Sequence, residues 1–182
     1  MILGPRLALI ALPGPIIADL LGGGSRAFLD HVGVAAPHGW ASEDGGVLGR
    51  RARQIADGVD HRWLLRAAVT REAPGMVGRA GFHGPPDANG MVEIGYRIDP
   101  PHRRRGYGLE CARLLVETAE RLPGVSVVRA SIAPDNTPSL RIAERLGFSQ
   151  VGEQIDEIDG LELVLERTAQ IRVGGATTSC HT

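Results

Sequence analysis

Residues 93–108 read EIGYRIDPPHRRRGYG, and they join a predicted strand to a predicted helix through a loop rich in arginine and glycine. Within the strand, which covers 91–98, apolar side chains at the even positions alternate with polar or small ones, as in a β-strand. Gly95 is a candidate position for a bulge in this strand. Pro100-Pro101 must end it, because proline has no N–H to donate to a β-ladder.

The loop from Arg103 to Gly108 has the composition of an anion-binding site. Its glycines, Gly106 and Gly108, allow the backbone to turn tightly and to point several N–H groups in one direction. The N-terminus of the helix that follows adds partial positive charge, and the three consecutive arginines add forked hydrogen-bond donors. The loop is therefore predicted to bind a pyrophosphate.

Two other phosphate-binding motifs do not fit this loop. A Walker A motif needs Gly-Lys-Ser/Thr, and all 20 basic residues of the chain are arginine. A Rossmann fingerprint needs a third glycine, where Cys111 stands, and an acidic residue at the end of the next strand, which reads Ser131-Ile132-Ala133. The interpretation that remains is a loop that binds acetyl-CoA.

The flanking patterns predict a mixed α/β domain with helices packed on a sheet. Leu109 to Leu122 is an amphipathic helix that Pro123-Gly124 ends. Asp159-Gly160 predicts a two-residue hairpin turn with Gly160 at positive φ. The other predicted strands cover 7–12, 63–70, 76–82, 125–133, 153–158 and 161–166, and the other predicted helices cover 15–21, 48–55 and 137–146.

Three segments of this chain resemble the GNAT superfamily of N-acetyltransferases. Residues 93–100 look like the family's central bulged strand, and Arg103-x-x-Gly106-x-Gly108 is similar to its motif A. The following family segment is matched by Asn136-Thr137-Pro138-Ser139-Leu140 together with Leu146-Gly147-Phe148. The resemblance covers roughly residues 63–166, and it is closest to the branch that contains ribosomal-protein alanine N-acetyltransferases.

The resemblance implies a mixed, mostly antiparallel sheet that splays at a central bulged strand and is flanked by helices. It implies one acetyltransferase domain over 1–168, with an acceptor-side segment at 1–60 and an acetyl-CoA-binding core at 63–166, followed by a flexible tail at 169–182. Acetyl-CoA is the implied acyl donor. The residues implied to bind it are Ile98, Arg103, Arg104, Arg105, Gly106, Tyr107, Gly108 and Asn136.

Glu93 and Ser139 are the candidate catalytic residues. Many family members carry a tyrosine that protonates the CoA thiolate, but Ala143 stands at that position here, and Ser139 is the nearest polar side chain. Glu93 could take the amine's proton through a water. Each candidate has a structural alternative: a solvent-facing strand residue for Glu93, a first-turn residue for Ser139, and a cap for Asn136. His83 and His102 are interpreted as loop or surface histidines.

The implied reaction is acetyl transfer to a primary amine, either a peptide or protein N-terminus or a small molecule, by direct attack on the thioester. Two alternatives remain open. One is a non-catalytic acyl-CoA-binding or sensing domain on the same fold, and the other is transfer of another acyl group such as succinyl. The acceptor pocket is expected in the N-terminal third, where the pattern is weakest, so the sequence does not name the amine.

The composition argues against other classes of partner. A net charge of −1 offers no basic excess to a nucleic-acid backbone, and no apolar run reaches the length of a membrane span. The histidines and cysteines lack the spacing of a metal site. Cys111 and Cys180 are too few for a disulfide framework, so a reducing cytoplasm is expected. A homodimer is left open.

Overall fold

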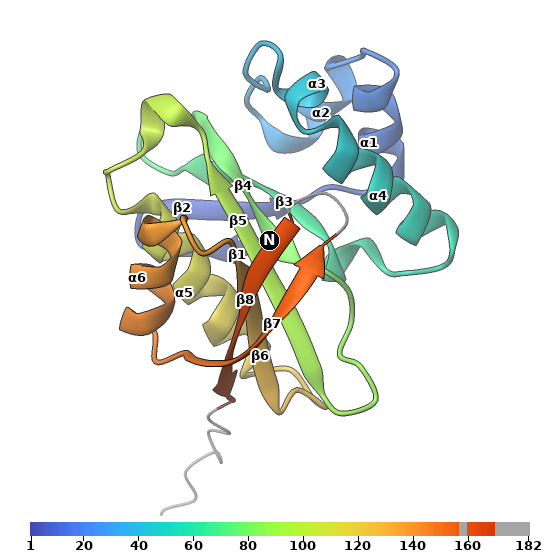
Figure 1. The fold of residues 1–182 in the computed structure, drawn as a ribbon. Coiled ribbons are helices and arrows are strands. Elements are labelled where there is room, and N and C mark those ends of the chain that lie inside the picture. The colour runs from blue at the N-terminus through green and yellow to red at the C-terminus, as the bar shows by residue number, and fades with distance from the viewer. Residues whose placement is uncertain (157–159, 170–182) are drawn as a thin grey trace, which may run out of the picture.

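The computed structural model describes residues 1–156 and 160–169, whose strands form an eight-stranded sheet (Figure 1). The strand order is β1-β2-β3-β4-β5-β6-β8-β7, with β5 and β6 parallel and the other neighbours antiparallel. The predicted mixed, mostly antiparallel sheet is confirmed. The strands are β1 (Ile2–Leu3), β2 (Leu7–Ala11), β3 (Leu65–Thr70), β4 (Met76–Phe82), β5 (Met91–Ile98), β6 (Val127–Ile132), β7 (Ser149–Asp156) and β8 (Gly160–Thr168).

Helices cover both faces of this sheet. Figure 1 shows α1 to α4 as a group on one side, with α5 and α6 on the other. Among the described residues, no helix combines the length and the hydropathy needed to cross a membrane. The helices are α1 (Gly14–Leu21), α2 (Arg26–Val32), α3 (Trp40–Glu43), α4 (Gly45–Ala56), α5 (Tyr107–Ala119) and α6 (Thr137–Arg145), and η1 (His61–Trp63) and η2 (Pro100–His102) are 3-10 turns.

Two apolar clusters, one on each face, hold the layers together. Because side chains alternate across a strand, Ala67 of β3 packs in the cluster with α1 to α4, and Ala68 packs in the cluster with α5. The first cluster includes Phe28 and Trp40, and the second includes Leu115. The second cluster also contains Leu7 and Leu9 of β2, so part of the predicted acceptor-side segment packs with the predicted cofactor-binding core.

Most predicted elements are present, with shifted ends. The strand predicted from 63 begins at Leu65, because His61–Trp63 forms a 3-10 turn. The helix predicted over 109–122 begins at Tyr107, directly after the left-handed Gly106, and its regular part ends at Ala119. The last three residues of the prediction instead include i to i+3 hydrogen bonds, such as Leu122 N to Ala119 O at 3.0 Å. The sequence did not predict β1, α2 or α3.

The sheet divides at β5. This strand pairs with β4 from Ile94 to Ile98, but it pairs with β6 from Met91 to Glu93 alone. His83 N donates to Glu93 O, so the backbone groups of the odd-numbered residues of β5 hydrogen-bond to β4. The even-numbered residues therefore direct their N–H and C=O groups to the other edge of β5, on the side of β6. The β4 register is regular across Gly95, so the splay comes from the end of the β6 pairing and not from an interruption of that register.

The terminal hairpin differs from its prediction in loop length. Gly160 has φ of 76°, as expected, but it pairs with Asp156 as the first residue of β8. Three residues therefore separate the paired positions, and the predicted two-residue turn is wrong. Asp159 lies outside the described residues, as does the predicted tail beyond Ala169, which is itself buried and donates to Ser126 O.

Cys111 lies fully buried in α5, and we expect it to be chemically silent. Burial raises the pKa of its thiol to about 12, which leaves about one thiolate in ten thousand at pH 8. In a Cys180→Ser variant, the native protein should release no chromophore from a chromogenic disulfide within minutes, and the guanidinium-unfolded protein should release one equivalent. Rapid reaction of the native protein would contradict this burial.

Candidate functional site

A cleft of about 860 Å³ opens between the end of β5, the arginine-glycine loop and the N-termini of α5 and α6. Eight of the ten residues predicted for the site line it: Ile98, Arg103, Arg104, Gly106, Tyr107, Gly108, Asn136 and Ser139. The other two, Arg105 and Glu93, are not among the lining residues. The cleft therefore brings together residues from three segments that are up to 41 positions apart in the sequence.

Two left-handed residues shape the loop backbone. Arg104 has φ of 60° and is the one non-glycine residue with positive φ in the described chain, and Gly106 has φ of 81° and caps α5. Left-handed residues at the beginning of a helix orient successive backbone amides toward one point. The first N–H groups of a helix also have no acceptor within the helix. Arg103 Nε donates to Ile98 O at 2.9 Å, which ties the loop to the end of β5.

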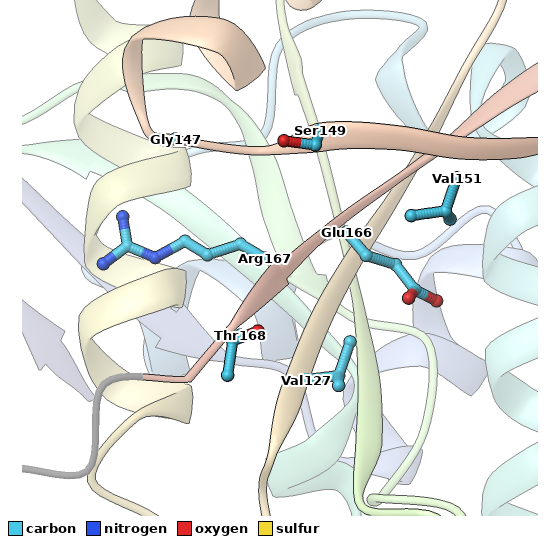
Figure 2. Close-up of a pocket in the computed structure, with 7 residues that line it drawn as sticks. All are labelled: Val127, Gly147, Ser149, Val151, Glu166, Arg167 and Thr168. Carbon is cyan, nitrogen blue, oxygen red and sulfur yellow. The ribbon is translucent and has the colours of Figure 1, made fainter.

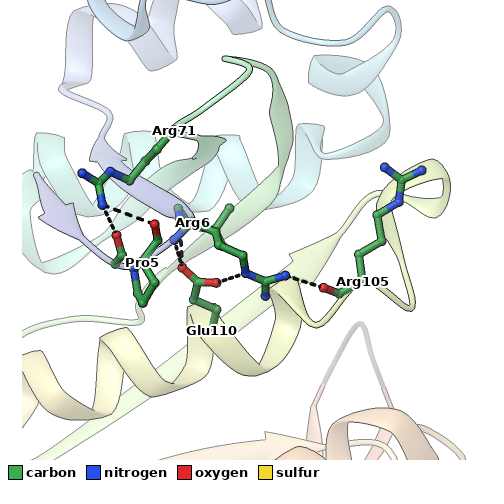
Figure 3. Close-up of polar contacts among 7 residues, drawn as sticks. Pro5, Arg6, Arg71, Arg105 and Glu110 are labelled. Atoms are coloured by element: carbon green, nitrogen blue, oxygen red, sulfur yellow. Dashed lines mark hydrogen bonds and ion pairs between the residues drawn. The ribbon is translucent and has the colours of Figure 1, made fainter.

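Arg6 anchors this loop (Figure 3), although no sequence motif singled it out. Its Nε donates to Glu110 Oε2 at 2.9 Å, and the backbone N–H groups of Arg6 and Leu7 both donate to Glu110 Oε1. The Arg6 guanidinium also donates to Arg105 O at 2.8 Å and lies 5.0 Å from the centre of the Tyr107 ring. The segment before β2 thus fixes both the loop and the first turn of α5.

Gly108 forms part of the cleft where α5 approaches α6 and β5. A Cβ at this position would lie 3.3 Å from Ile142 Cδ1 and 3.5 Å from Tyr96 Cε2. The first distance is tighter than ordinary packing and the second is an ordinary contact, so the glycine lets α5 and α6 meet closely at this point.

The start of α6 supplies the polar side chains on the opposite side of the cleft. Asn136 caps α6, and its Oδ1 accepts from Ser139 N at 3.3 Å. Ser139 also hydrogen-bonds to the phenol of Tyr96, which lines the cleft from β5. Burial raises the pKa of Tyr96, and the hydrogen bond from Ser139 opposes that rise. The alternating pattern predicted Tyr96 only as a strand residue, and its phenol hydroxyl was the one sequence signal of a place in the cleft.

Glu93 lies on the other face of β5, where it contacts His83. His83 Nδ1 is 3.4 Å from Glu93 Oε1, and the Ser131 hydroxyl donates to the same carboxylate. Burial alone would raise the pKa of Glu93, but the hydrogen bond and charge of His83, the bond from Ser131 and the charge of Arg129 lower it below its usual value. Glu93 is therefore ionised at neutral pH.

A second cavity, of about 470 Å³, lies by β6, β7 and β8 and contains no residue predicted for the site (Figure 2). Figure 2 shows Glu166 and Arg167 projecting to opposite sides of β8. Arg167 pairs with Glu120 at 2.8 Å, and Glu166 pairs with Arg129 at 2.6 Å. Because these charged side chains already have partners within the protein, this cavity is poorly suited to bind a pyrophosphate.

Known proteins match both the sequence and the fold. Residues 36–149 match the model of the acetyltransferase (GNAT) domain. An uncharacterized N-acetyltransferase of Bacillus subtilis, YjdG, is 40% identical over 86 residues, or 47% of this chain and 49% of YjdG. The match thus spans about half the length of that relative.

Solved structures extend the likeness to nearly the whole chain. A GNAT-family acetyltransferase from Bacillus anthracis superposes with a TM-score of 0.62 at 17% identity, over 92% of this chain and 98% of that one. RimL, a ribosomal L7/L12 alpha-N-protein acetyltransferase in complex with coenzyme A, gives 0.62 at 16% identity, over 92% and 97%. At these identities the likeness establishes the fold. The domain match over 36–149, on this fold, shows that the chain belongs to the GNAT family of acetyltransferases.

Proposed function

We propose that the cleft binds acetyl-CoA and that the protein transfers the acetyl group to a primary amine. The observation that carries this proposal is the convergence of the left-handed loop, the start of α5 and the open edge of β5 on one cleft. The amides and arginines at one end suit a pyrophosphate, and the strand edge at the other end suits an extended amide-containing arm. The presence of CoA in the RimL structure supports the same assignment.

The residues fit this cosubstrate in order along the cleft. We assign the pyrophosphate to the amides from Arg104 to Gly108, with the Arg103 and Arg105 side chains providing charge. The pantetheine arm would run along the open edge of β5 near Ile98, and Asn136 would hydrogen-bond near the reactive end. Bound there, acetyl-CoA supplies an acetyl group activated as a thioester.

Catalysis would rest mainly on positioning. The N–H of Tyr96 points to the edge of β5 that β6 has left, where it can donate to the acetyl oxygen as negative charge develops. Ser139, hydrogen-bonded to Tyr96, would donate a proton to the departing sulfur of CoA. The sequence-based hypothesis gives Glu93 the proton that the amine loses. Since an α-amine has a pKa near ~8, roughly a tenth of it is already neutral at pH 7, and a modest base suffices.

A non-catalytic acyl-CoA-binding domain is the second candidate, and Ala143 in place of the family's tyrosine favours it. The Tyr96–Ser139 hydrogen bond weighs against it, because this pair places hydroxyl protons in the cleft without that tyrosine. The two candidates differ in turnover and not in CoA binding.

We expect the purified protein to bind CoA and to release thiol from acetyl-CoA with at least one acceptor. The panel is free amino acids, short peptides with free α-amines, and polyamines, with thiol release followed by a chromogenic disulfide and products confirmed by mass spectrometry. CoA binding without turnover of any amine would favour the binding-domain alternative. Failure to bind CoA would contradict both.

A further inference from the structure

We propose that His83 is the group that takes the proton from the acceptor amine, and that Glu93 is a positioning residue that holds the His83 ring. This inference rests on the proposed acetyl transfer and specifies its base. It reassigns Glu93, whose carboxylate would act through the imidazole and not on the amine.

The first support is the position of His83 over Gly95. A Cβ at position 95 would lie 2.6 Å from His83 Nε2, so the ring occupies space that a glycine leaves open. Gly95 precedes Tyr96, whose N–H faces the open edge of β5. Nε2 therefore lies beside the peptide proposed to hold the acetyl oxygen, on the face of β5 covered by α4. With its side chain 41% exposed, His83 can be reached by an amine and can return its proton to solvent.

The second support is the contact that orients the ring. Nδ1 faces Glu93 Oε1 at 3.4 Å and Glu93 is ionised, so this contact favours the tautomer with its proton on Nδ1. The lone pair of the neutral ring is then on Nε2, the nitrogen over Gly95. A carboxylate that fixes the tautomer also stabilises the imidazolium that forms when Nε2 takes a proton.

The third support is that α4 holds the backbone of His83. Gln54 Nε2 donates to His83 O at 2.7 Å, and Arg51, which is 6% exposed, donates to the same oxygen at 3.4 Å. The charged groups that act on Glu93 of this pair are Arg129 of β6 and Arg51 of α4, and Arg51 is in turn close to Arg50 and Arg79. Arg79 is paired with Asp44, and Arg129 with Glu166.

In the proposed step, the amine nitrogen forms a bond to the acetyl carbon, the carbon–sulfur bond breaks, and its electrons leave on sulfur. The amine proton passes to His83 Nε2 and then to solvent. The sulfur takes a proton from the Ser139 hydroxyl, which is hydrogen-bonded to Tyr96. No oxidant, metal or further reactant is needed.

We expect His83→Ala to lower kcat by roughly 100-fold, the low end of the range for a general base, with KM for acetyl-CoA within about twofold of the parent value. The assay uses the best acceptor of the amine panel. Added imidazole should restore activity in a saturable way. The acidic limb of the parent's pH profile should be absent from the variant.

His61→Ala is the matched control. His61 Nδ1 is 3.6 Å from Asp60 Oδ1, and its side chain is 39% exposed, so the pair resembles His83–Glu93 in contact and exposure. It lies in η1, and the ring that occupies the space over Gly95 is that of His83. Its kcat and pH profile should match those of the parent, and imidazole should not change them.

Two further variants separate positioning from direct catalysis. Glu93→Gln should keep an acidic limb but lower kcat, because His83 remains and loses its charged partner. Gly95→Ala should lower kcat by displacing the Nε2 end of the ring.

If His83→Ala keeps parental kcat and its pH profile, while Glu93→Gln abolishes turnover, Glu93 is the base and this inference is wrong. If the parent binds CoA but acetylates no amine in the panel, the proposed function itself fails.

Discussion

Gly108→Val is expected to bind CoA roughly 10- to 100-fold more weakly than the parent protein. A Cβ at this position already lies 3.3 Å from Ile142 Cδ1 and 3.5 Å from Tyr96 Cε2, and the two γ-carbons of valine must extend further. Such overpacking costs about 1–3 kcal/mol, which the free protein relieves by moving α5. CoA binding must reverse that movement, and each 1.4 kcal/mol this requires is about a tenfold change in affinity. The first turn of α5 would move away from the cleft that its amides line. Calorimetric titration with CoA measures the change.

Gly46→Val provides the control for helix propensity. Gly46 is the second residue of α4, as Gly108 is of α5, and apart from its chain neighbours and the nearby backbone of α4 no described atom lies within 4 Å of its Cβ position. We expect this variant to bind CoA like the parent, with both variants folded by circular dichroism. Equal CoA affinity in Gly108→Val and the parent would place the CoA site elsewhere.

Glu110→Ala should destabilise the protein by about 3 kcal/mol, because it removes the acceptor of buried backbone N–H groups as well as a charged pair. The carboxylate is 7% exposed and accepts from the N–H groups of Arg6 and Leu7 and from Arg6 Nε. For a chain of this size the melting temperature should fall by roughly 6–12 °C. Urea unfolding followed by circular dichroism gives the free energy of unfolding.

Glu117→Ala tests whether this effect depends on burial. Glu117 lies on the same helix and pairs with Arg121 at 3.8 Å, but both side chains are exposed. An exposed pair of this kind contributes about 0.5 kcal/mol or less. A similar loss of stability in the two variants would show that the buried contacts of Glu110 are not the cause.

Local patterns predicted the part of the site that is local in sequence. The alternation in 91–98, the two prolines and the glycines at 106 and 108 all act within a few residues, so the strand, the loop and α5 followed from them. Arg6, which holds the loop from outside, did not follow from them. Arg6 reaches Arg105 across 99 positions, and nothing near Arg6 in the sequence signals that contact.

His83 illustrates the same limit on the other face of β5. In sequence it is a histidine beside a turn-rich segment, ten residues from Glu93. The contact depends on the β4–β5 register, which places His83 N on Glu93 O, and on the open space above Gly95. Register between strands is set by packing across the whole sheet. The short helices α2 and α3 were likewise missed, because their apolar residues are too few to show a helical period.

The most direct test of the account is to compare amide chemical shifts of the protein titrated with CoA and with acetyl-CoA. Both ligands should shift the amides from Arg104 to Gly108, and acetyl-CoA should add shifts at Gly95, Tyr96 and the His83 ring. Tyr96 lines the cleft on the edge of β5 that β6 leaves, Gly95 precedes it on β5, and His83 Nε2 lies over Gly95. Shifts confined to the second cavity, around Ser149 and Thr168, would contradict the account.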